Sequence, residues 1–362
     1  MDDTPPSDRP LRAGWTTGAC ACAAAVAAYT ALVTRRFPDP VTIQLPKGLT
    51  PRFPLSQTEL RDDWASAGIV KDAGDDPDVT HGAKIIARVM RRSGTGEPQF
   101  AAGPGVGTVT KPGLPIPVGE PAITPKPRAM ILDNLARTAR DLGQDWPAPL
   151  TITLSIPGGE KIAEKTMNGR LGIVGGLSIL GTTGVVVPYS ISAWIHSIHR
   201  AVDVALADGQ THLVASTGST SEAAALARLG LPEIAAIEMG GHAGALFKYL
   251  RRARPERLTL AGGVGKMMKL GQGALDLHSG QSRVNSQQVA GWIDAAGGDG
   301  GAILGMESAA TMLMQTVNIG VDLSDLISKK ALETARQNLH SQTAVSVLVF
   351  DRGGKLLGQT DG

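Results

Sequence analysis

The second half of the chain is built from a pattern that occurs three times: an apolar strand, a turn of small residues and a helix. The expected strands are 211–216, 234–239 and 257–261, and Gly, Ser or Thr residues follow each of them closely. Three such units in succession favour a parallel sheet flanked by helices, with ligands at the carboxyl ends of the strands. An apolar run at 345–350 is expected to be the last strand. We therefore predict a three-layer α/β domain with a mainly parallel sheet over residues 191–362.

The first half has a mixed pattern of helices, strands and long connections rich in Gly and Pro. A chain of 362 residues is long for one core and fits two domains of ordinary size. After a leader at 1–10, which we expect to be disordered, we predict an α+β domain over residues 11–190. Its expected elements are an Ala-rich helix at 19–33, a strand at 41–45, a helix at 127–142 and a strand at 150–156.

The composition is that of a globular protein without a nucleic-acid partner. Hydrophobic residues make up 42% of the chain, and the net charge is only +2, with Lys and Arg scattered rather than gathered in a stripe. Cys20 and Cys22 lie two positions apart in a predicted helix, so they cannot pair with each other there. A chain with two cysteines has no disulfide framework. We predict a cytoplasmic protein in which both thiols are buried in the core.

The Ala-rich run at 19–33 is too short to be predicted as a membrane anchor. Roughly 20 residues are needed to span a bilayer, and the leader before it carries acidic residues rather than a basic start. Thr16, Thr17 and Gly18 supply a helix-capping signal directly ahead of the run. We therefore predict a buried helix and no membrane partner. The same three residues have a second interpretation, as an N–H and hydroxyl cradle for a carboxylate or phosphate.

Residues 170–184, R-L-G-I-V-G-G-L-S-I-L-G-T-T-G, form an apolar run that is unusually rich in glycine. It is too rich in Gly and hydroxyl residues for an ordinary helix and too apolar for a flexible linker. Gly175, Gly176 and Gly181 remove the Cβ atoms that would prevent a close approach to the backbone. Two interpretations follow: a ligand-binding segment, or a tight buried loop between strands.

A second candidate segment, V-K-D-A-G-D-D-P-D-V-T-H-G, covers residues 70–82. It places several carboxylates and an imidazole within ten positions, namely Asp72, Asp75, Asp76, Asp78 and His81. Such a group can handle protons or bind a hard metal ion, although the spacing does not match a calcium loop and metal binding ranks low. The alternative is a solvated turn. Apolar residues on both sides of the segment favour a loop that lies against the core.

Three histidines remain as candidates. His196 and His199 lie three apart on a predicted helix, where they can ligate a metal together or lie at a surface, and no third ligand has a suitable spacing. His278, followed by Ser279, comes after the third strand–turn–helix unit, at a suitable place for a ligand. The P-loop, the strict G-x-G-x-x-G turn and the G-x-S-x-G elbow are all missing from the sequence.

Five segments, taken in order, resemble the cobalt-precorrin-5B C1-methyltransferase family, the CbiD type. They are L-R-A-G-W-T-T-G-A-C at 11–20, the acidic segment at 70–82, G-V-G-T-V-T-K-P-G-L at 105–114, N-G-R-L-G-I-V-G-G-L-S-I-L-G-T-T-G at 168–184 and L-D-L-H-S at 275–279. The resemblance covers nearly the whole chain from Leu11. It implies transfer of a methyl group from S-adenosylmethionine to ring carbon C1 of a cobalt-containing tetrapyrrole, giving cobalt-precorrin-6A in cobalamin biosynthesis. The cobalt arrives with the substrate, so no protein metal site is expected.

On this resemblance we expect the tetrapyrrole to bind the N-terminal domain and S-adenosylmethionine the C-terminal domain, with the reaction between the two halves. The expected catalytic residues are Asp72, Asp75, Asp76 and His278; the expected substrate-binding residues are Thr16, Thr17, Gly18, Lys111, Thr182 and Thr183; the expected cofactor-binding residues are Gly175, Gly176, Thr217, Gly218, Ser219, Gly241 and Gly263. A sulfonium donor is cationic and the acetates of the substrate are anionic. The acids are therefore expected to face the donor or the ring nitrogens.

Two other functions remain open from the sequence. One is a phosphotransferase that uses the Gly, Ser and Thr residues of 170–184 as a phosphate cradle. The other is a corrinoid carrier that holds the ring without catalysis and has no methyl-donor site. A monomer and a homo-oligomer also both remain open.

Overall fold

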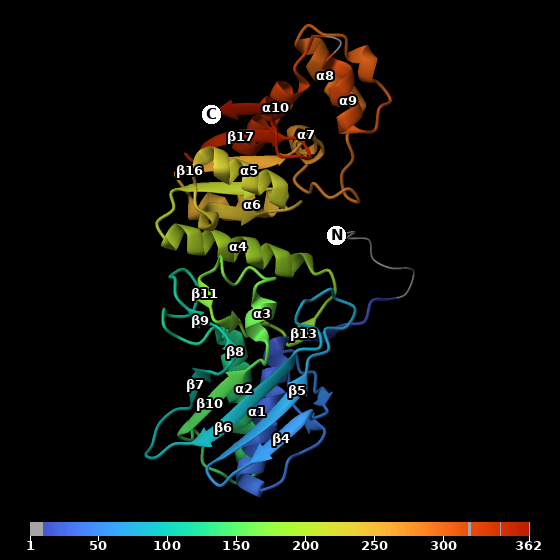
Figure 1. Ribbon diagram of the computed structural model, residues 1–362. Coiled ribbons are helices and arrows are strands. Elements are labelled where there is room, and N and C mark those ends of the chain that lie inside the picture. The colour runs from blue at the N-terminus through green and yellow to red at the C-terminus, as the bar shows by residue number, and fades with distance from the viewer. Residues whose placement is uncertain (1–9, 318–319, 341, 362) are drawn as a thin grey trace. The chain divides into compact units, whose positions relative to one another are not determined.

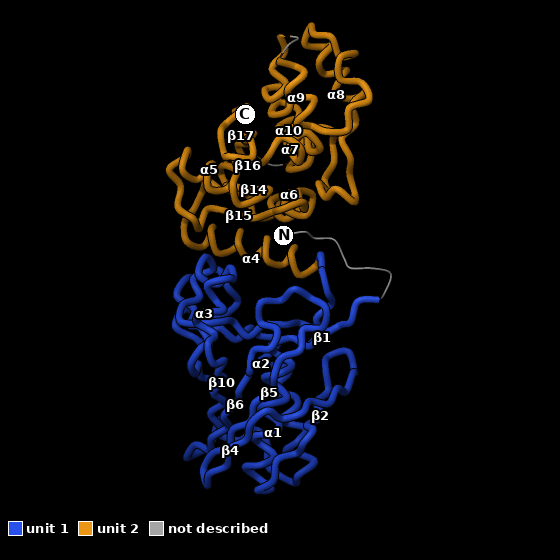
Figure 2. Tube along the Cα trace, turned by 45° about the vertical axis from the view of Figure 1, so that its right-hand side comes forward, with its two compact units in different colours: residues 1–191 blue, residues 192–362 orange. Residues whose placement is uncertain are grey.

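The computed structural model describes residues 10–317, 320–340 and 342–361, and the chain divides into two compact units (Figure 2). The N-terminal unit extends to Ile191 and the C-terminal unit starts at Ser192. The sequence pattern predicts this change between residues 190 and 191. The expected mixed class, with helices and sheets, is confirmed. Apart from Pro10, the leader predicted to be disordered lies outside the described residues.

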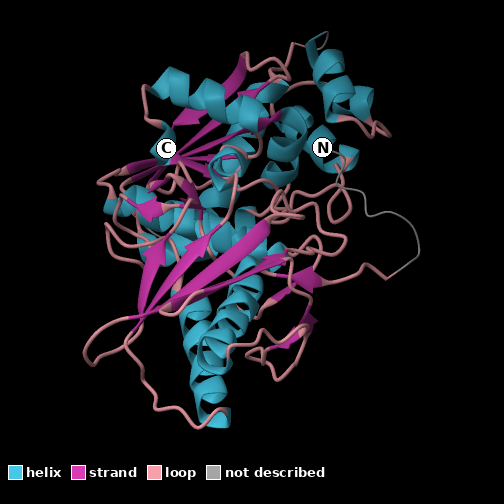
Figure 3. Ribbon diagram, turned by 60° about the horizontal axis from the view of Figure 1, so that its bottom comes forward, coloured by secondary structure: helices cyan, strands magenta, loops and turns pink. Residues whose placement is uncertain are grey.

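The N-terminal unit is a five-stranded sheet with two long helices packed along it (Figures 1 and 3). The strand order is β4-β5-β6-β10-β7, and only the pair β10–β7 is parallel. The bounds are β4 Gln57–Leu60, β5 Trp64–Val70, β6 Lys84–Arg91, β7 Gln99–Ala102, β10 Leu150–Ser155, α1 Thr17–Thr34 and α2 Pro125–Asp141. Helix α1 packs against β5, β6 and α2, so it forms the centre of this core.

Helix α1 is buried on all sides, which its small side chains make possible. Thr16 caps its start by accepting a hydrogen bond from the Ala19 N–H at 3.1 Å, and Arg35 ends it in a left-handed conformation. With 18 residues it is long and apolar enough to cross a membrane, but 83% of that window is buried inside the protein, as in the core helix of a soluble protein. The prediction of a buried helix is confirmed.

Both cysteines lie in α1 and are fully buried, as predicted. Burial raises the pKa of the Cys20 thiol to about 12, and it also raises the pKa of the Cys22 thiol. Two neutral thiols of this kind behave as small apolar core groups.

Short strand pairs build the loop region of the N-terminal unit. The pairs are β1 Gly14–Trp15 with β13 Val185–Val186, β2 Val41–Thr42 with β3 Arg52–Phe53, β8 Gly105–Val106 with β12 Gly176–Leu177, and β9 Thr108–Val109 with β11 Ile173–Val174; helix α3 covers Gly159–Ala163. The strand predicted at 41–45 is therefore only two residues long. The run at 170–184 is not one loop, because it contributes two short strands that pair with residues 105–109.

The C-terminal unit contains a five-stranded sheet in the order β15-β14-β16-β17-β18, in which only β18 is antiparallel to its neighbour. The strands are β14 His212–Ser216, β15 Ala236–Glu238, β16 Arg257–Gly263, β17 Ala344–Phe350 and β18 Leu356–Asp361. The run predicted to be the last strand is therefore the last but one. Strand β18 escapes prediction because its sequence, L-L-G-Q-T-D, has neither an apolar run nor a clear alternation.

Helices cover both faces of this sheet. Helix α5 packs on one face, and α4, α6, α7 and α10 pack on the other. The bounds are α4 Ile191–Ala207, α5 Ser219–Leu229, α6 Ala243–Ala253, α7 Val264–Gly271, α8 Ser286–Ala295, α9 Ala309–Thr316 and α10 Leu323–Leu339, with short 3-10 turns at Glu233–Ala235 and Gly300–Ile303. From β14 the chain passes through α5 to β15 on one side, and then through α6 to β16 on the other side of β14. The strand order therefore reverses between β14 and β16, and such a switch point is where open α/β sheets bind ligands.

Candidate functional site

The acidic segment forms the connection between β5 and β6, and three of its carboxylates are held by hydrogen bonds within the N-terminal unit. The Arg12 guanidinium donates to both oxygens of Asp72, at 2.5 and 2.9 Å. The backbone N–H of Arg12 donates to Asp75 at 2.7 Å, and the N–H of Tyr189 donates to Asp76 at 2.9 Å. The three predicted catalytic aspartates are thus brought together around one cation and two amides.

Asp72 is held in its anionic form by its neighbours. The hydrogen bond from Arg12 and then the Gly74 N–H lower the pKa of Asp72 to about 2. A carboxyl group with such a low pKa is ionised throughout the neutral range, so it is a poor proton donor or acceptor. What it can supply is a fixed negative charge beside Arg12.

A buried lysine, which the sequence analysis did not single out, anchors the same loop. Lys71 is only 1% exposed, and its ammonium forms an ion pair with Asp78 and donates to the Thr80 hydroxyl at 2.7 Å. Burial alone would raise the pKa of Asp78, but the charge of Lys71 and the hydrogen bonds from Lys71 and Thr80 together lower it. The only signal in the sequence is a lysine placed directly after an apolar strand.

His81 is oriented by the backbone of the same loop. Its Nδ1 accepts a hydrogen bond from the Ala73 N–H at 3.1 Å, so the neutral ring carries its proton on Nε2. The side chain is 54% exposed, and Nδ1 lies 4.0 Å from an oxygen of Asp72. The imidazole therefore has a defined tautomer and an accessible donor.

The glycines of the 170–184 run serve internal packing at two of three positions. A Cβ on Gly176 would lie 2.3 Å from the backbone of Gly105, and one on Gly181 would lie 2.5 Å from the Thr16 hydroxyl. At Gly175 a Cβ would meet nothing within 4 Å, although its φ of +85° favours glycine. The close approach predicted from the sequence is thus to the protein's own chain at Gly176 and Gly181. Of these three glycines, only Gly175 has open space in which a ligand could lie.

The predicted cradle at the start of α1 is largely used within the unit. The Gly18 N–H donates to the Leu180 carbonyl at 3.1 Å, and Thr16 is the helix cap. The prediction of a helix cap is confirmed at Thr16, and the second interpretation, a cradle of free N–H groups, does not hold at Gly18, because residues 180–184 fold back over the helix end. Thr16 and Thr17 are both buried, Thr182 is exposed, and the Thr183 hydroxyl donates to the Val185 carbonyl at 3.2 Å. These four threonines lie in one region.

Lys111 lies apart from these threonines, beside Gly172. A Cβ on Gly172 would lie 2.5 Å from the Lys111 methylenes, so the lysine stem extends across that glycine. Thr110, next to Lys111, donates both its N–H and its hydroxyl to the Gly172 carbonyl. The first methylenes of Lys111 are therefore held in place beside Gly172, and the ammonium lies at the end of this positioned side chain.

Four of the predicted cofactor-binding residues of the C-terminal unit lie where the strand order reverses. Thr217, Gly218 and Ser219 follow β14, and Gly263 ends β16. Lys266, in the first turn of α7, connects the two strand ends by donating to the Thr217 carbonyl at 2.9 Å. A Cβ on Gly218 would meet nothing within 4 Å. This turn therefore has open space beside Gly218.

Gly241 and His278 come together at the end of β15. A Cβ on Gly241 would lie 2.8 Å from the His278 ring, and the Leu277 N–H donates to the Gly241 carbonyl at 2.8 Å. The ring of His242 is 5.9 Å from that of His278 and 6.3 Å from that of Trp194. Burial is the main cause that lowers the pKa of His242. An aromatic cluster thus borders this edge of the sheet.

His196 and His199 do not form the start of a metal site. The His199 ring stacks on Tyr249 with centroids 3.9 Å apart, and its pKa is lowered first by burial and then by His196. Among the residues described in the structure, no group of three or more His, Cys, Asp or Glu side chains is placed to hold a metal ion.

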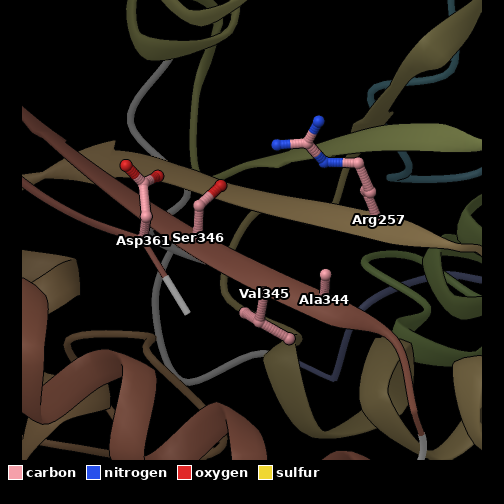
Figure 4. A pocket seen from close by; sticks show the side chains of 5 residues that line it. All are labelled: Arg257, Ala344, Val345, Ser346 and Asp361. Atoms are coloured by element: carbon pink, nitrogen blue, oxygen red, sulfur yellow. The ribbon is translucent and has the colours of Figure 1, made fainter.

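A cavity near the amino ends of the strands in the sheet of the C-terminal unit is too small for a substrate. It is lined by Arg257, Ala344, Val345, Ser346 and Asp361, which lie near the amino ends of β16 and β17 and at the end of β18 (Figure 4). Its volume of about 30 Å³ has room for a water molecule or two. The carboxyl ends of the strands remain the better candidate for ligand binding.

An α/β unit whose strand ends are open at the switch point is typical of nucleotide-binding enzymes. Similarity to known proteins identifies the family. A model of the CbiD family matches residues 4–188. The protein named cobalt-precorrin-5B C(1)-methyltransferase of Brucella anthropi is 52% identical over 99% of both chains, and so is that of Brucella canis. A crystal structure of the cobalamin biosynthesis protein cbiD from Archaeoglobus fulgidus is 29% identical and covers 70% of this chain and 78% of its own, with a TM-score of 0.39. The chain belongs to the CbiD family.

Proposed function

We propose that this protein is a methyltransferase that methylates C1 of cobalt-precorrin-5B, with S-adenosylmethionine as the methyl donor. The observation that carries the proposal is 52% identity over 99% of both chains with proteins of that name. Cobalt belongs to the tetrapyrrole substrate. The cytoplasm is the proposed compartment, in keeping with the two buried thiols.

The donor site is proposed at the carboxyl ends of β14 and β16. Gly218 leaves open space above the turn, and the start of α5 directs backbone N–H groups toward it. The ammonium of Lys266 adds a positive charge between the two strand ends. These groups suit the carboxylate end of S-adenosylmethionine.

The tetrapyrrole is proposed to bind the loop region of the N-terminal unit. A ring with several acetate and propionate groups needs hydroxyls, amides and separate cations rather than one basic stripe. The exposed Thr182 and the positioned stem of Lys111 supply such groups. The internal bonds of Thr16 and Gly18 make them supports for this region rather than direct ligands.

The acidic loop is proposed to act through charge and not through proton transfer. The methyl group of a sulfonium is already activated, so the enzyme chiefly has to align donor and acceptor carbon. Asp72, paired with Arg12 and ionised, orders the loop, and Asp75 and Asp76 add negative charge that can stabilise positive charge during the methyl transfer. His81 presents a defined N–H donor next to them.

Incubation of the purified protein with cobalt-precorrin-5B and S-adenosylmethionine is expected to add one methyl group to the ring and release S-adenosylhomocysteine. Mass spectrometry of both products measures this directly. A parallel reaction with ATP and magnesium in place of the donor is the control. Ring binding without any gain in mass would instead support a corrinoid carrier and refute the proposed activity.

Asp75→Asn and Lys111→Met are expected to affect different kinetic constants. Asn keeps an oxygen for the Arg12 N–H but removes the charge, so kcat should fall about tenfold while ring affinity changes little. Met keeps the methylenes that pack on Gly172 but removes the ammonium, so ring affinity should weaken about tenfold with kcat preserved. Steady-state kinetics and direct binding decide the matter, with the exposed Asp63→Asn as control. If Asp75→Asn weakened ring affinity and Lys111→Met lowered kcat, the roles proposed for these two residues would have to be exchanged.

A further inference from the structure

The last residue of the edge strand β15 carries a carboxylate that the fold itself does not use. Glu238 pairs in register with Ser216, the last residue of β14, so the two side chains leave the same face of the sheet. The Ser216 hydroxyl donates to Glu222 of α5, which is only 4% exposed and belongs to the packing of that face. Glu238 is half-buried, and among the residues that the structure describes its carboxylate has no hydrogen-bond or ion-pair partner.

The position of Glu238 in the fold is informative. It follows Gly218, the turn glycine after β14, by 20 residues. In open α/β sheets that bind nucleosides, an acidic residue about 20 positions after the turn, at the end of the second strand, accepts hydrogen bonds from ribose hydroxyls. Here β14 is the first strand and β15 the second, and α5 connects them. The glycine pattern of that turn is reduced to one glycine, but the carboxylate is in the corresponding place.

An aromatic surface lies directly beyond Glu238. Gly240, with a φ of +58°, packs against Trp194, and a Cβ there would lie 3.3 Å from the indole. Trp194 is nevertheless 43% exposed. A purine gains affinity by stacking on an exposed aromatic ring. The indole of Trp194, on α4, thus contacts Gly240, which follows Glu238 by two positions.

We propose that the carboxyl end of β15 binds the adenosine half of the methyl donor, with Glu238 accepting hydrogen bonds from the ribose hydroxyls and Trp194 stacking on the adenine. This inference rests on the proposed function, because it takes S-adenosylmethionine as the donor. It also fixes the direction of the ligand across the sheet. The methionine end lies toward Gly218 and Lys266, and the adenosine end lies toward the edge strand.

The test measures binding of S-adenosylhomocysteine and of its 2′,3′-dideoxy analogue by calorimetry. The wild-type protein should prefer the hydroxylated ligand by about tenfold or more, because the hydrogen bonds go to a charged acceptor. Glu238→Gln should lose most of that preference, while Glu256→Gln, an exposed residue directly before the amino end of β16, should keep it. Trp194→Leu should weaken both ligands alike, by about tenfold.

The outcomes separate this inference from the proposed function. A folded Glu238→Gln variant that still prefers the hydroxylated ligand as strongly as the wild type would overturn the assignment of Glu238 and leave the methyltransferase standing. Failure of the wild-type protein to bind S-adenosylhomocysteine at all would overturn the proposed donor and this inference with it.

Discussion

Lys71→Met is expected to lower the free energy of unfolding of the N-terminal unit by about 3 kcal/mol. The substitution nearly preserves volume, but it leaves the carboxylate of Asp78 without the ammonium that offsets its burial. It also removes the donor to Thr80, so the loop between β5 and β6 loses both of its contacts with the side chain of the buried lysine. Urea unfolding of the wild type and the variant measures the difference.

Two further variants make the Lys71 prediction specific. Lys47→Met removes an exposed charge in the same unit and should stay within about 0.5 kcal/mol of the wild type. The double variant Lys71→Met/Asp78→Asn should recover much of the loss, because no unpaired charge remains. Equal stability of Lys71→Met and the wild type would show that the ion pair does not anchor the loop.

Gly218→Val is expected to weaken binding of S-adenosylhomocysteine by roughly a hundredfold, about 2.7 kcal/mol. The valine side chain would enter the open space above the β14 turn, where the donor is proposed to lie. The fold should tolerate the change, because the φ of Gly218 is 175°, an extended conformation that any residue adopts. Calorimetry with the purified variant gives the affinity.

Gly291→Val is the matched control for Gly218→Val. Gly291 lies in α8, far along the chain from the strand ends, and a Cβ there also meets nothing within 4 Å. The Gly291→Val variant should bind S-adenosylhomocysteine like the wild type, and circular dichroism should show that both variants are folded. Unchanged affinity in folded Gly218→Val would move the donor away from this turn.

The elements that could be predicted from the sequence are those with a strong local pattern. Helix α1 follows from its alanines and the cap at Thr16, and β14, β16 and β17 follow from apolar runs that end in small residues. Strand β18 could not be predicted because a half-exposed edge strand needs only a few apolar contacts. The strand expected at 41–45 is shorter because only Val41 and Thr42 find a pairing partner.

The candidate site was harder to predict because its contacts join distant parts of the chain. The density of carboxylates points to the acidic segment, but its partner Arg12 lies 60 positions from Asp72, and no local pattern links them. The glycines at 176 and 181 were found as close-contact positions, yet the sequence does not say that their neighbours are Gly105 and Thr16. Burial of Lys71 depends on the sheet and on α1, so it is a property of the assembled unit.

The burial of both native thiols in α1 has a practical consequence. Neither Cys20 nor Cys22 is accessible, and their raised pKa values keep them protonated at neutral pH, so maleimides and other thiolate-selective reagents should leave the folded wild-type chain unlabelled. A single cysteine introduced at an exposed site therefore becomes a unique point for a fluorophore or spin label, with the native sequence otherwise intact. Placed at Ser219, such a label would report on ligand binding at the β14 turn without a cysteine-free background, in which the tightly packed centre of the helix would have to be altered.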